Sequence, residues 1–90
     1  MEQNFWNTLP KPILALAPMV GVTDRAFRQV AKNWGAQVVY SEMISADAIV
    51  HGAPKALAML GHDASEYPLV IQLMGKEPEV LAQAARIAEQ

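Results

Sequence analysis

Residues 13–17 read ILALA, a continuous apolar run that ends at Pro18. Such a run is typical of a β-strand that is buried on both faces, because helices cover both surfaces of a parallel sheet. Two later stretches share this character: residues 37–42 contain Val-Val-Tyr, and residues 69–73 read LVIQL. The sequence therefore predicts three buried strands.

Segments with helical periodicity separate these runs. The first helix is expected to begin at Thr23, a preferred N-cap residue, and to end before Gly35, which suits the position just after a helix. Its apolar side chains recur at helical spacing: Phe27, Val30, Ala31 and Trp34. This spacing predicts an amphipathic helix between the first two strands.

Two shorter helical turns are predicted between the second and third strands. Ser45 can cap a turn that reaches Val50, and Pro54 can begin another turn that ends at Gly61. A further helix is predicted from Pro78, because proline is favoured at the first helical position. Its apolar face consists of Val80, Leu81, Ala84, Ile87 and Ala88.

The alternation of buried strands with helices predicts parallel βαβ units and places the chain in the α/β class. A doubly wound fold usually has a Gly-rich phosphate motif after its first strand, whereas residues 18–23 read PMVGVT. At roughly 30 residues per unit, three βα units make about three-eighths of a TIM (β/α)8 barrel. Because the last helix reaches Gln90 in mid-pattern, we expect residues 1–90 to be the truncated N-terminal part of a TIM-barrel domain.

Length and composition limit what the 90 residues can do alone. A domain of this size buries only about 60% of its unfolded surface, which argues against a large, self-contained enzyme. Seven Lys and Arg against nine Asp and Glu give a net charge of −2, so no basic face for a nucleic-acid backbone is expected. The absence of cysteine makes the cytoplasm the default compartment, and no apolar stretch approaches the roughly 18 residues of a membrane span.

In a barrel of this type, functional residues lie at the carboxyl ends of the strands. The candidate segments are residues 17–21, 41–43 and 72–75, which are expected at one rim. Pro18 fixes φ and Gly21 permits close backbone approach, so the first segment could lie against a planar ligand with Met19 in contact. An ordinary strand-to-helix turn has the same composition, and both interpretations stay open.

Two polar side chains come at the ends of predicted strands. The Gln72 amide suits the edge of a flavin or a base, although a buried amide that neighbouring backbone satisfies is an equal alternative. Glu42 must be paired, hydrogen-bonded or shifted in pKa at such a place. It could line a site or hold the loop of Arg25 or Lys76 in position, and the residues alone leave both open.

The remaining charged side chains are interpreted as surface residues. Arg25, Arg28 and Lys32 recur on one face of the first helix, where they could touch phosphate but more often form a solvated face. His51 and His62 have no cysteine partners and no H-E-x-x-H spacing, so no metal site is predicted.

Residues 16–28, LAPMVGVTDRAFR, closely resemble the opening motif of the tRNA-dihydrouridine synthases. Residues 35–36 and 40–43, GA and YSEM, look like the second-strand block of that family, and residues 68–79, PLVIQLMGKEPE, look like its third. The three segments occur in the right order with the right gaps. The resemblance runs from about Leu14 to Gln90.

The resemblance implies an FMN-dependent enzyme with an N-terminal TIM barrel and a smaller helical domain that binds tRNA. Such an enzyme reduces the C5–C6 double bond of uridine in tRNA to 5,6-dihydrouridine, with NAD(P)H as the reductant of the flavin. Glu42 and Met43 match only the wall of the pocket. The cofactor-binding residues that the motifs imply are Pro18, Met19, Val20 and Gln72.

The family's catalytic acid, a cysteine, is expected beyond Gln90, so these residues carry no catalytic residue and are expected to be inactive alone. Contact with tRNA is expected through parts of the protein outside these residues, and neither a metal nor a membrane is implied. Two alternatives remain. One is another FMN-dependent TIM-barrel oxidoreductase, and the other is a truncated, non-catalytic interaction module whose sheet edges pair with another chain.

Overall fold

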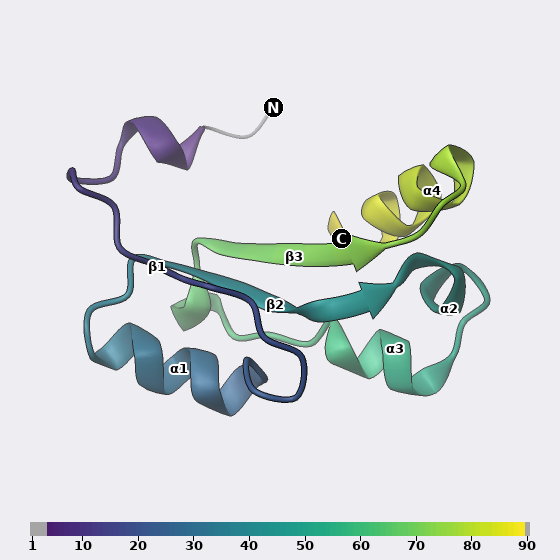
Figure 1. Ribbon diagram of the computed structural model, residues 1–90, viewed down its shortest axis with the longest axis horizontal. Coiled ribbons are helices and arrows are strands. Elements are labelled where there is room, and N and C mark those ends of the chain that lie inside the picture. The colour runs from purple at the N-terminus through teal and green to yellow at the C-terminus, as the bar shows by residue number, and fades with distance from the viewer. Residues whose placement is uncertain (1–3, 90) are drawn as a thin grey trace.

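The structure is a computed structural model that describes residues 4–89. Its three strands, β1 (Ala15–Leu16), β2 (Val38–Ser45) and β3 (Leu69–Met74), form one parallel sheet in the order β1-β2-β3. Figure 1 shows β2 and β3 pointing toward the same end of the sheet. The predicted parallel α/β arrangement is confirmed for this part of the chain.

Helices connect the strands in the predicted order. The short 3-10 helix η1 (Phe5–Asn7) precedes β1, and α1 (Arg25–Asn33) connects β1 to β2. Between β2 and β3 the chain forms α2 (Ala46–Val50), α3 (Pro54–Met59) and the 3-10 helix η2 (Ala64–Glu66), and α4 (Pro78–Glu89) follows β3. In Figure 1, α1 and α3 lie below the strands, and α4 lies near α2.

The cap of α1 differs from the prediction by one residue. Asp24, not Thr23, is the N-cap, because its Oδ1 atom accepts a 2.9 Å hydrogen bond from the Phe27 N–H. Thr23 is fully buried and its hydroxyl turns back toward the preceding loop. At the other end of the helix, Gly35 has a φ of +109°, a conformation that favours glycine, as the sequence predicts.

The other helix starts are confirmed. The Ser45 hydroxyl accepts a 3.2 Å hydrogen bond from the Ala48 N–H at the start of α2. Pro54 and Pro78 are the first residues of α3 and α4. β2 is longer than predicted, because it continues beyond Glu42 as far as the cap of α2.

The core lies where β2, α2, α3 and α4 meet. The buried side chains of this cluster are Ile44, Ala46, Ile49, Ala56 and Ala84. Leu73 of β3 pairs with Ile44 in the sheet and packs against the cluster. The core therefore anchors the carboxyl ends of β2 and β3.

The β1 side of the sheet is less buried than predicted. β1 has two residues, and the preceding Leu14 is 60% exposed. The apolar face of α1 is also open, with Trp34 87% exposed. A strand needs cover on both faces to be buried, and among the residues that the structure describes only β2 pairs with β1. The prediction of fully buried strands is therefore wrong for β1, and also for β3, whose residues are half-buried or exposed within the described chain.

No helix within residues 4–89 combines the length and the apolar character that crossing a membrane requires.

Candidate functional site

The loop between β1 and α1 is closed by its own hydrogen bonds. The Met19 carbonyl accepts from the N–H groups of Val22 and Thr23, each at 3.0 Å. The Thr23 hydroxyl accepts from the Met19 N–H at 3.0 Å and donates to the Met19 carbonyl at 3.1 Å. Gly21 has a φ of +79°, which lets the chain turn between them. Residues 18–23 therefore form a defined turn, which Thr23 closes through its hydrogen bonds to Met19.

Glu42 ties this loop to the sheet. Its Oε1 atom, on β2, accepts a 2.7 Å hydrogen bond from the Gly21 N–H. A bond of this kind to a carboxylate is stronger than one between neutral groups. Glu42 thus holds a loop, as one of its two interpretations predicts, but it does so through a backbone amide and not through Arg25 or Lys76.

β2 contains a bulge where it approaches this loop. Tyr40 pairs with Val70, but the next pair is Met43 with Gln72, so β2 has one more residue than β3 between the two pairs. The buried Ser41 lies at the bulge, and its hydroxyl accepts a 2.9 Å hydrogen bond from the Gln72 N–H. Sequence reasoning missed this role, for which the only signal is a serine inside an apolar run.

The Gln72 side chain lies on the sheet face opposite Leu69, Ile71 and Leu73, because successive side chains of a strand alternate. The residue is half-buried, and none of the hydrogen bonds within residues 4–89 uses its side-chain amide. The alternative in which neighbouring backbone satisfies this amide therefore has no support. The amide is available to a ligand at the strand ends.

The three predicted segments lie side by side. The Gly21–Glu42 bond joins the first to the second, and the Ser41–Gln72 bond joins the second to the third. Within the first segment, Pro18 is half-buried. The exposed apolar side chains of the three strand ends are Met19, Val20, Met43 and Met74. The three strand ends are thus linked by hydrogen bonds, and they present apolar side chains to solvent. This arrangement suits a flat, partly apolar ligand.

Of the three positive charges of α1, Arg28 and Lys32 are hydrogen-bonded within the chain and do not form a solvated face with Arg25. Arg28 is 2% exposed, and its Nε atom lies 2.6 Å from Oε1 of the fully buried Glu66. Its Nη1 atom donates to the Thr23 carbonyl at 2.9 Å. The surface interpretation of Arg28 is wrong because this side of α1 packs against η2. Arg28 is not available to a phosphate either, since its donors are directed inside the chain.

Lys32 is also engaged within the chain. Its Nζ atom donates to the carbonyls of Gln37 at 2.7 Å and Tyr67 at 2.8 Å. Burial lowers the pKa of Lys32 from its ordinary value of 10.5, and the negative charge of Glu66 opposes part of this change. Arg25 keeps the expected exposure, with 54% of its side chain open to solvent.

The histidines lie outside the strand-end site. His51 is exposed, as the surface interpretation predicts. That interpretation is wrong for His62, which is half-buried and is hydrogen-bonded to the Leu60 carbonyl and the Tyr67 hydroxyl, each at 2.9 Å. In the described part of the chain, no three side chains of His, Cys, Asp or Glu come together as metal ligands would.

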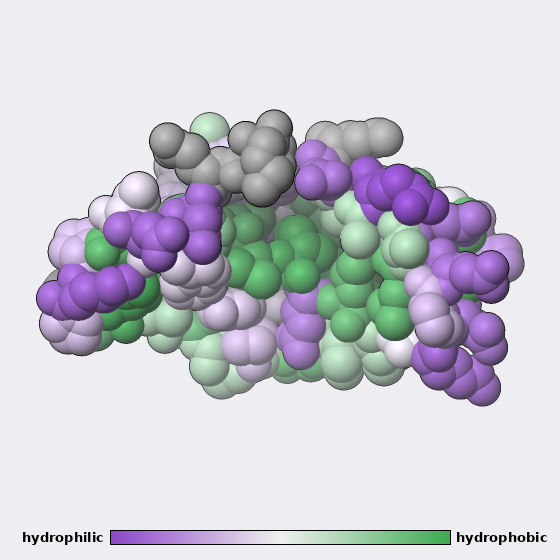
Figure 2. All heavy atoms as spheres, turned by 90° about the horizontal axis from the view of Figure 1, so that it is seen from above, coloured by the Kyte–Doolittle hydropathy of each residue, from purple (hydrophilic) through white to green (hydrophobic). Residues whose placement is uncertain are grey.

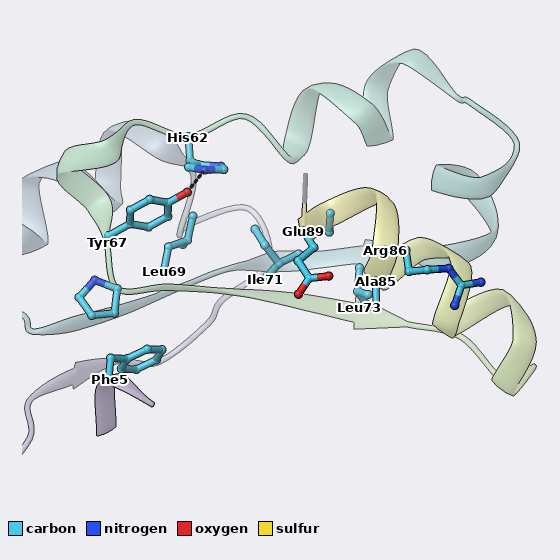
Figure 3. A pocket seen from close by; sticks show the side chains of 11 residues that line it. Phe5, His62, Tyr67, Leu69, Ile71, Leu73, Ala85, Arg86 and Glu89 are labelled. Carbon is cyan, nitrogen blue, oxygen red and sulfur yellow. Dashed lines mark hydrogen bonds between the residues drawn. The ribbon is translucent and has the colours of Figure 1, made fainter. Parts of the chain in front are cut away.

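A groove of about 810 Å³ along β3 contains none of the predicted site residues. Figure 3 shows Leu69, Ile71 and Leu73 lining it from β3, with the His62–Tyr67 pair at one end. Figure 2, seen from above β3, shows a band of apolar side chains between polar ends. Most of this lining comes from β3 and α4, and its apolar character is typical of a packing face that a further element covers.

The fold is that of an α/β protein in which the three motif segments meet at the carboxyl ends of parallel strands. The family model described as Dihydrouridine synthase (Dus) matches residues 15–90, and the chain belongs to this family.

Named relatives agree with this assignment. The chain is 43% identical to tRNA-dihydrouridine synthase B of Pseudomonas aeruginosa over 79 residues, which are 88% of this chain and 24% of that protein. It is also 43% identical over 86 residues to the synthase B of Xanthomonas axonopodis pv. citri, covering 96% and 25% of the two chains. A tRNA-dihydrouridine(20/20a) synthase of Xanthomonas campestris is 41% identical over 90 residues, 91% of this chain and 26% of that protein. The chain thus spans about a quarter of the length of these relatives.

Proposed function

We propose that residues 1–90 are the N-terminal part of the TIM-barrel domain of a tRNA-dihydrouridine synthase. The three parallel strands with their connecting helices are the start of such a barrel, and the matched relatives are about four times longer than the chain. The rest of the barrel and the helical tRNA-binding domain belong, in this proposal, to a longer chain. The further strands would cover the apolar groove along β3.

The proposed reaction is the reduction of uridine C5–C6 to 5,6-dihydrouridine in tRNA. FMN, reduced by NAD(P)H, supplies the hydride chemistry when it is bound. The chain contains no cysteine, so the acid that protonates the base would lie outside residues 1–90. The task of the present residues is to bind and orient the flavin, and tRNA would be held by the rest of the protein.

The residues at the strand ends fit a flavin. Met19 and Val20 expose 42% and 67% of their surface and offer apolar contact to a planar ring. The N–H groups of Met19 and Gly21 are used inside the chain, and Pro18 has none. Within residues 4–89 the N–H of Val20 has no hydrogen bond, so it is the free backbone donor that we assign to the cofactor.

Gln72 completes the proposed cofactor site. An amide has both a donor and an acceptor, which matches the alternating carbonyl and N–H groups at the edge of a flavin ring. Ser41, on the neighbouring strand, holds the backbone of Gln72 through a hydrogen bond, and this bond fixes the position of the side-chain amide along the strand. Met43, its partner in the sheet, would form part of the pocket wall.

One observation carries this proposal: the three segments that match the family motifs are hydrogen-bonded to one another at a single end of the sheet. An oxidoreductase that binds a flavin at the same rim but reduces a free small molecule would share this geometry. The matched relatives carry tRNA-dihydrouridine synthase in their names, which favours tRNA as the substrate. The cytoplasmic location stays a prediction.

The test is flavin retention in the longer chain. We expect Gln72→Leu to weaken FMN binding about tenfold, the effect of losing a hydrogen bond to the ring. Gln83→Leu, at an exposed glutamine of α4, is the matched control and should bind FMN like the wild type. Flavin bound to purified protein is measured from its visible absorption, and dihydrouridine formation in tRNA is assayed on the same samples. Equal flavin occupancy in both variants would remove Gln72 from the site.

A further inference from the structure

Glu66 is a fully buried carboxylate on η2, far along the chain from the strand-end loop. Its Oε1 atom accepts from Arg28 Nε at 2.6 Å, and its Oε2 atom accepts from the Asp63 N–H at 2.8 Å. Arg25 Nε lies 3.9 Å from Oε2. Both oxygens are therefore occupied, and the orientation of the carboxylate is fixed.

The Arg28 guanidinium connects this carboxylate to two other segments. Nη1 donates to the Thr23 carbonyl at 2.9 Å, and Nη2 donates to the Gly61 carbonyl at 3.3 Å. A planar guanidinium with donors in fixed directions sets the relative positions of all three partners, which a lysine cannot do. Arg28 thus joins the end of the 18–23 loop to the segment that follows α3 and to η2.

Thr23 is the residue at which this network meets the candidate cofactor loop. Its carbonyl is held by Arg28, while its hydroxyl and its N–H hold Met19. On the sheet side, Glu42 holds Gly21. The loop is therefore fixed from two directions, by a helix through Arg28 and by a strand through Glu42.

A contribution to stability alone does not account for the buried ion pair of Arg28 and Glu66. Removing two charges from water is costly, and well-packed apolar residues often stabilise a protein as well as a buried ion pair does. Apolar residues could not bind the carbonyls of Thr23 and Gly61 or the Asp63 N–H. Of these three bonds, the one to the Thr23 carbonyl is the one that acts on the 18–23 loop.

We propose that Arg28 and Glu66 are positioning residues that set the shape of the 18–23 loop for the flavin, acting through Thr23 and Met19. The inference rests on the proposed function, because it assumes that this loop contacts the cofactor. It assigns a role in cofactor binding to Glu66, which itself lies outside the loop and fully inside the protein.

The first test replaces both partners, so that no single buried charge remains. In the longer chain, Arg28→Met combined with Glu66→Leu should retain a cooperative thermal transition. We expect FMN to bind about tenfold more weakly and its visible circular dichroism to change, because the ring then lies on a loop of altered shape. Lys55→Met combined with Glu79→Leu, at two exposed residues of α3 and α4, removes the same charges and should leave both quantities unchanged.

A second pair of variants tests the same link without touching the ion pair. Thr23→Val removes the hydroxyl that clamps Met19 with little change in volume, and it should weaken FMN binding and alter its circular dichroism. Thr23→Ser restores the hydroxyl and should restore both readouts. This pair decides the matter where the double variant fails to fold.

The proposal is overturned where a folded double variant, or a folded Thr23→Val protein, binds FMN with the affinity and the dichroism of the wild type. Failure of the proposed function is a different result, because the wild type itself would then retain no flavin.

Discussion

The carboxylate of Glu42 accepts a 2.7 Å hydrogen bond from the backbone N–H of Gly21, a residue 21 positions earlier in the chain. The bond joins the strand-end loop to the central strand of the sheet. It gives Glu42 a defined role in the shape of the site, whatever ligand the site holds.

In the longer chain, in which this variant and the next three are measured, Glu42→Ala should therefore loosen the loop. We expect a loss of about 1 kcal/mol in the free energy of unfolding, the net contribution of one hydrogen bond, and faster amide hydrogen exchange in residues 18–23. Glu42→Gln retains a hydrogen-bond acceptor, so amide exchange in the loop should be slower in this variant than in Glu42→Ala. Glu79→Ala, at an exposed carboxylate of α4, serves as control. Equal exchange rates in all four proteins would show that Glu42 does not restrain the loop.

Ser41→Ala tests the bulge of β2. The substitution leaves the N–H of the half-buried Gln72 without its acceptor, the hydroxyl of the buried Ser41, which should lower the free energy of unfolding by about 1–3 kcal/mol. Ser65→Ala, at an exposed serine of η2, should change it by less than about 0.5 kcal/mol. Urea unfolding curves measure both, and a Ser41 variant as stable as the Ser65 variant would contradict the role of the hydroxyl.

Asp24→Ala tests the corrected cap of α1. Loss of the side chain that accepts from the Phe27 N–H should lower the free energy of unfolding by about 1 kcal/mol. Asp24→Ser should retain most of the stability, because serine is also a preferred N-cap residue. Thermal unfolding of the two variants gives the comparison. If serine and alanine destabilise equally, the side-chain cap contributes nothing.

Lys32 predicts a pH dependence of stability. Because burial lowers the pKa of Lys32 in the folded protein below 10.5, the unfolded chain binds the proton more tightly than the folded chain does. Protonated Lys32 therefore lowers the stability of the folded protein. This destabilisation is complete below the pKa of Lys32 in the folded protein, and it is lost as the pH rises from that pKa toward 10.5. The free energy of unfolding of the wild type, minus that of Lys32→Gln, should therefore increase with pH in this window. A difference that falls with pH would reverse the assigned direction.

Trp34 reports on the proposed continuation of the barrel. It is 87% exposed within this chain, on an apolar helix face that further elements would cover. In a Trp6→Phe background, the emission of Trp34 should be shifted to the blue in the longer chain relative to isolated residues 1–90. We expect the isolated residues to be poorly folded or associated. A sharp cooperative transition of a monomer, with the same emission as the longer chain, would argue against the barrel.

Local patterns predict much of this fold because they depend on neighbours in sequence. Apolar runs predicted the positions of β2 and β3. The helix starts were predicted from Ser45, Pro54 and Pro78, because capping and the fixed φ of proline act within one helical turn. The first strand was placed correctly, but its burial depends on elements that pack against it and not on its own residues.

The details of the site were harder to predict, because they depend on distant residues. Arg28 matches the spacing of a solvated face, and only the position of Glu66, 38 residues later, makes it an internal side chain. The bulge at Ser41 depends on pairing with β3, which no local pattern of β2 contains. The motifs located the three strand-end segments, and the structure added the bonds between them.

The extra residue in β2 divides the strand into two stretches whose side chains alternate out of phase. Before the bulge, Val38 and Val39 are fully buried, and after it Met43 is 40% exposed at the rim. A one-residue deletion between Tyr40 and Met43 would remove the bulge, because each strand would then have one residue between the two pairs, and Tyr40 would still face Val70 and Met43 would still face Gln72. The length of this stretch of β2 can therefore change by one residue without changing which side chains the core and the rim present.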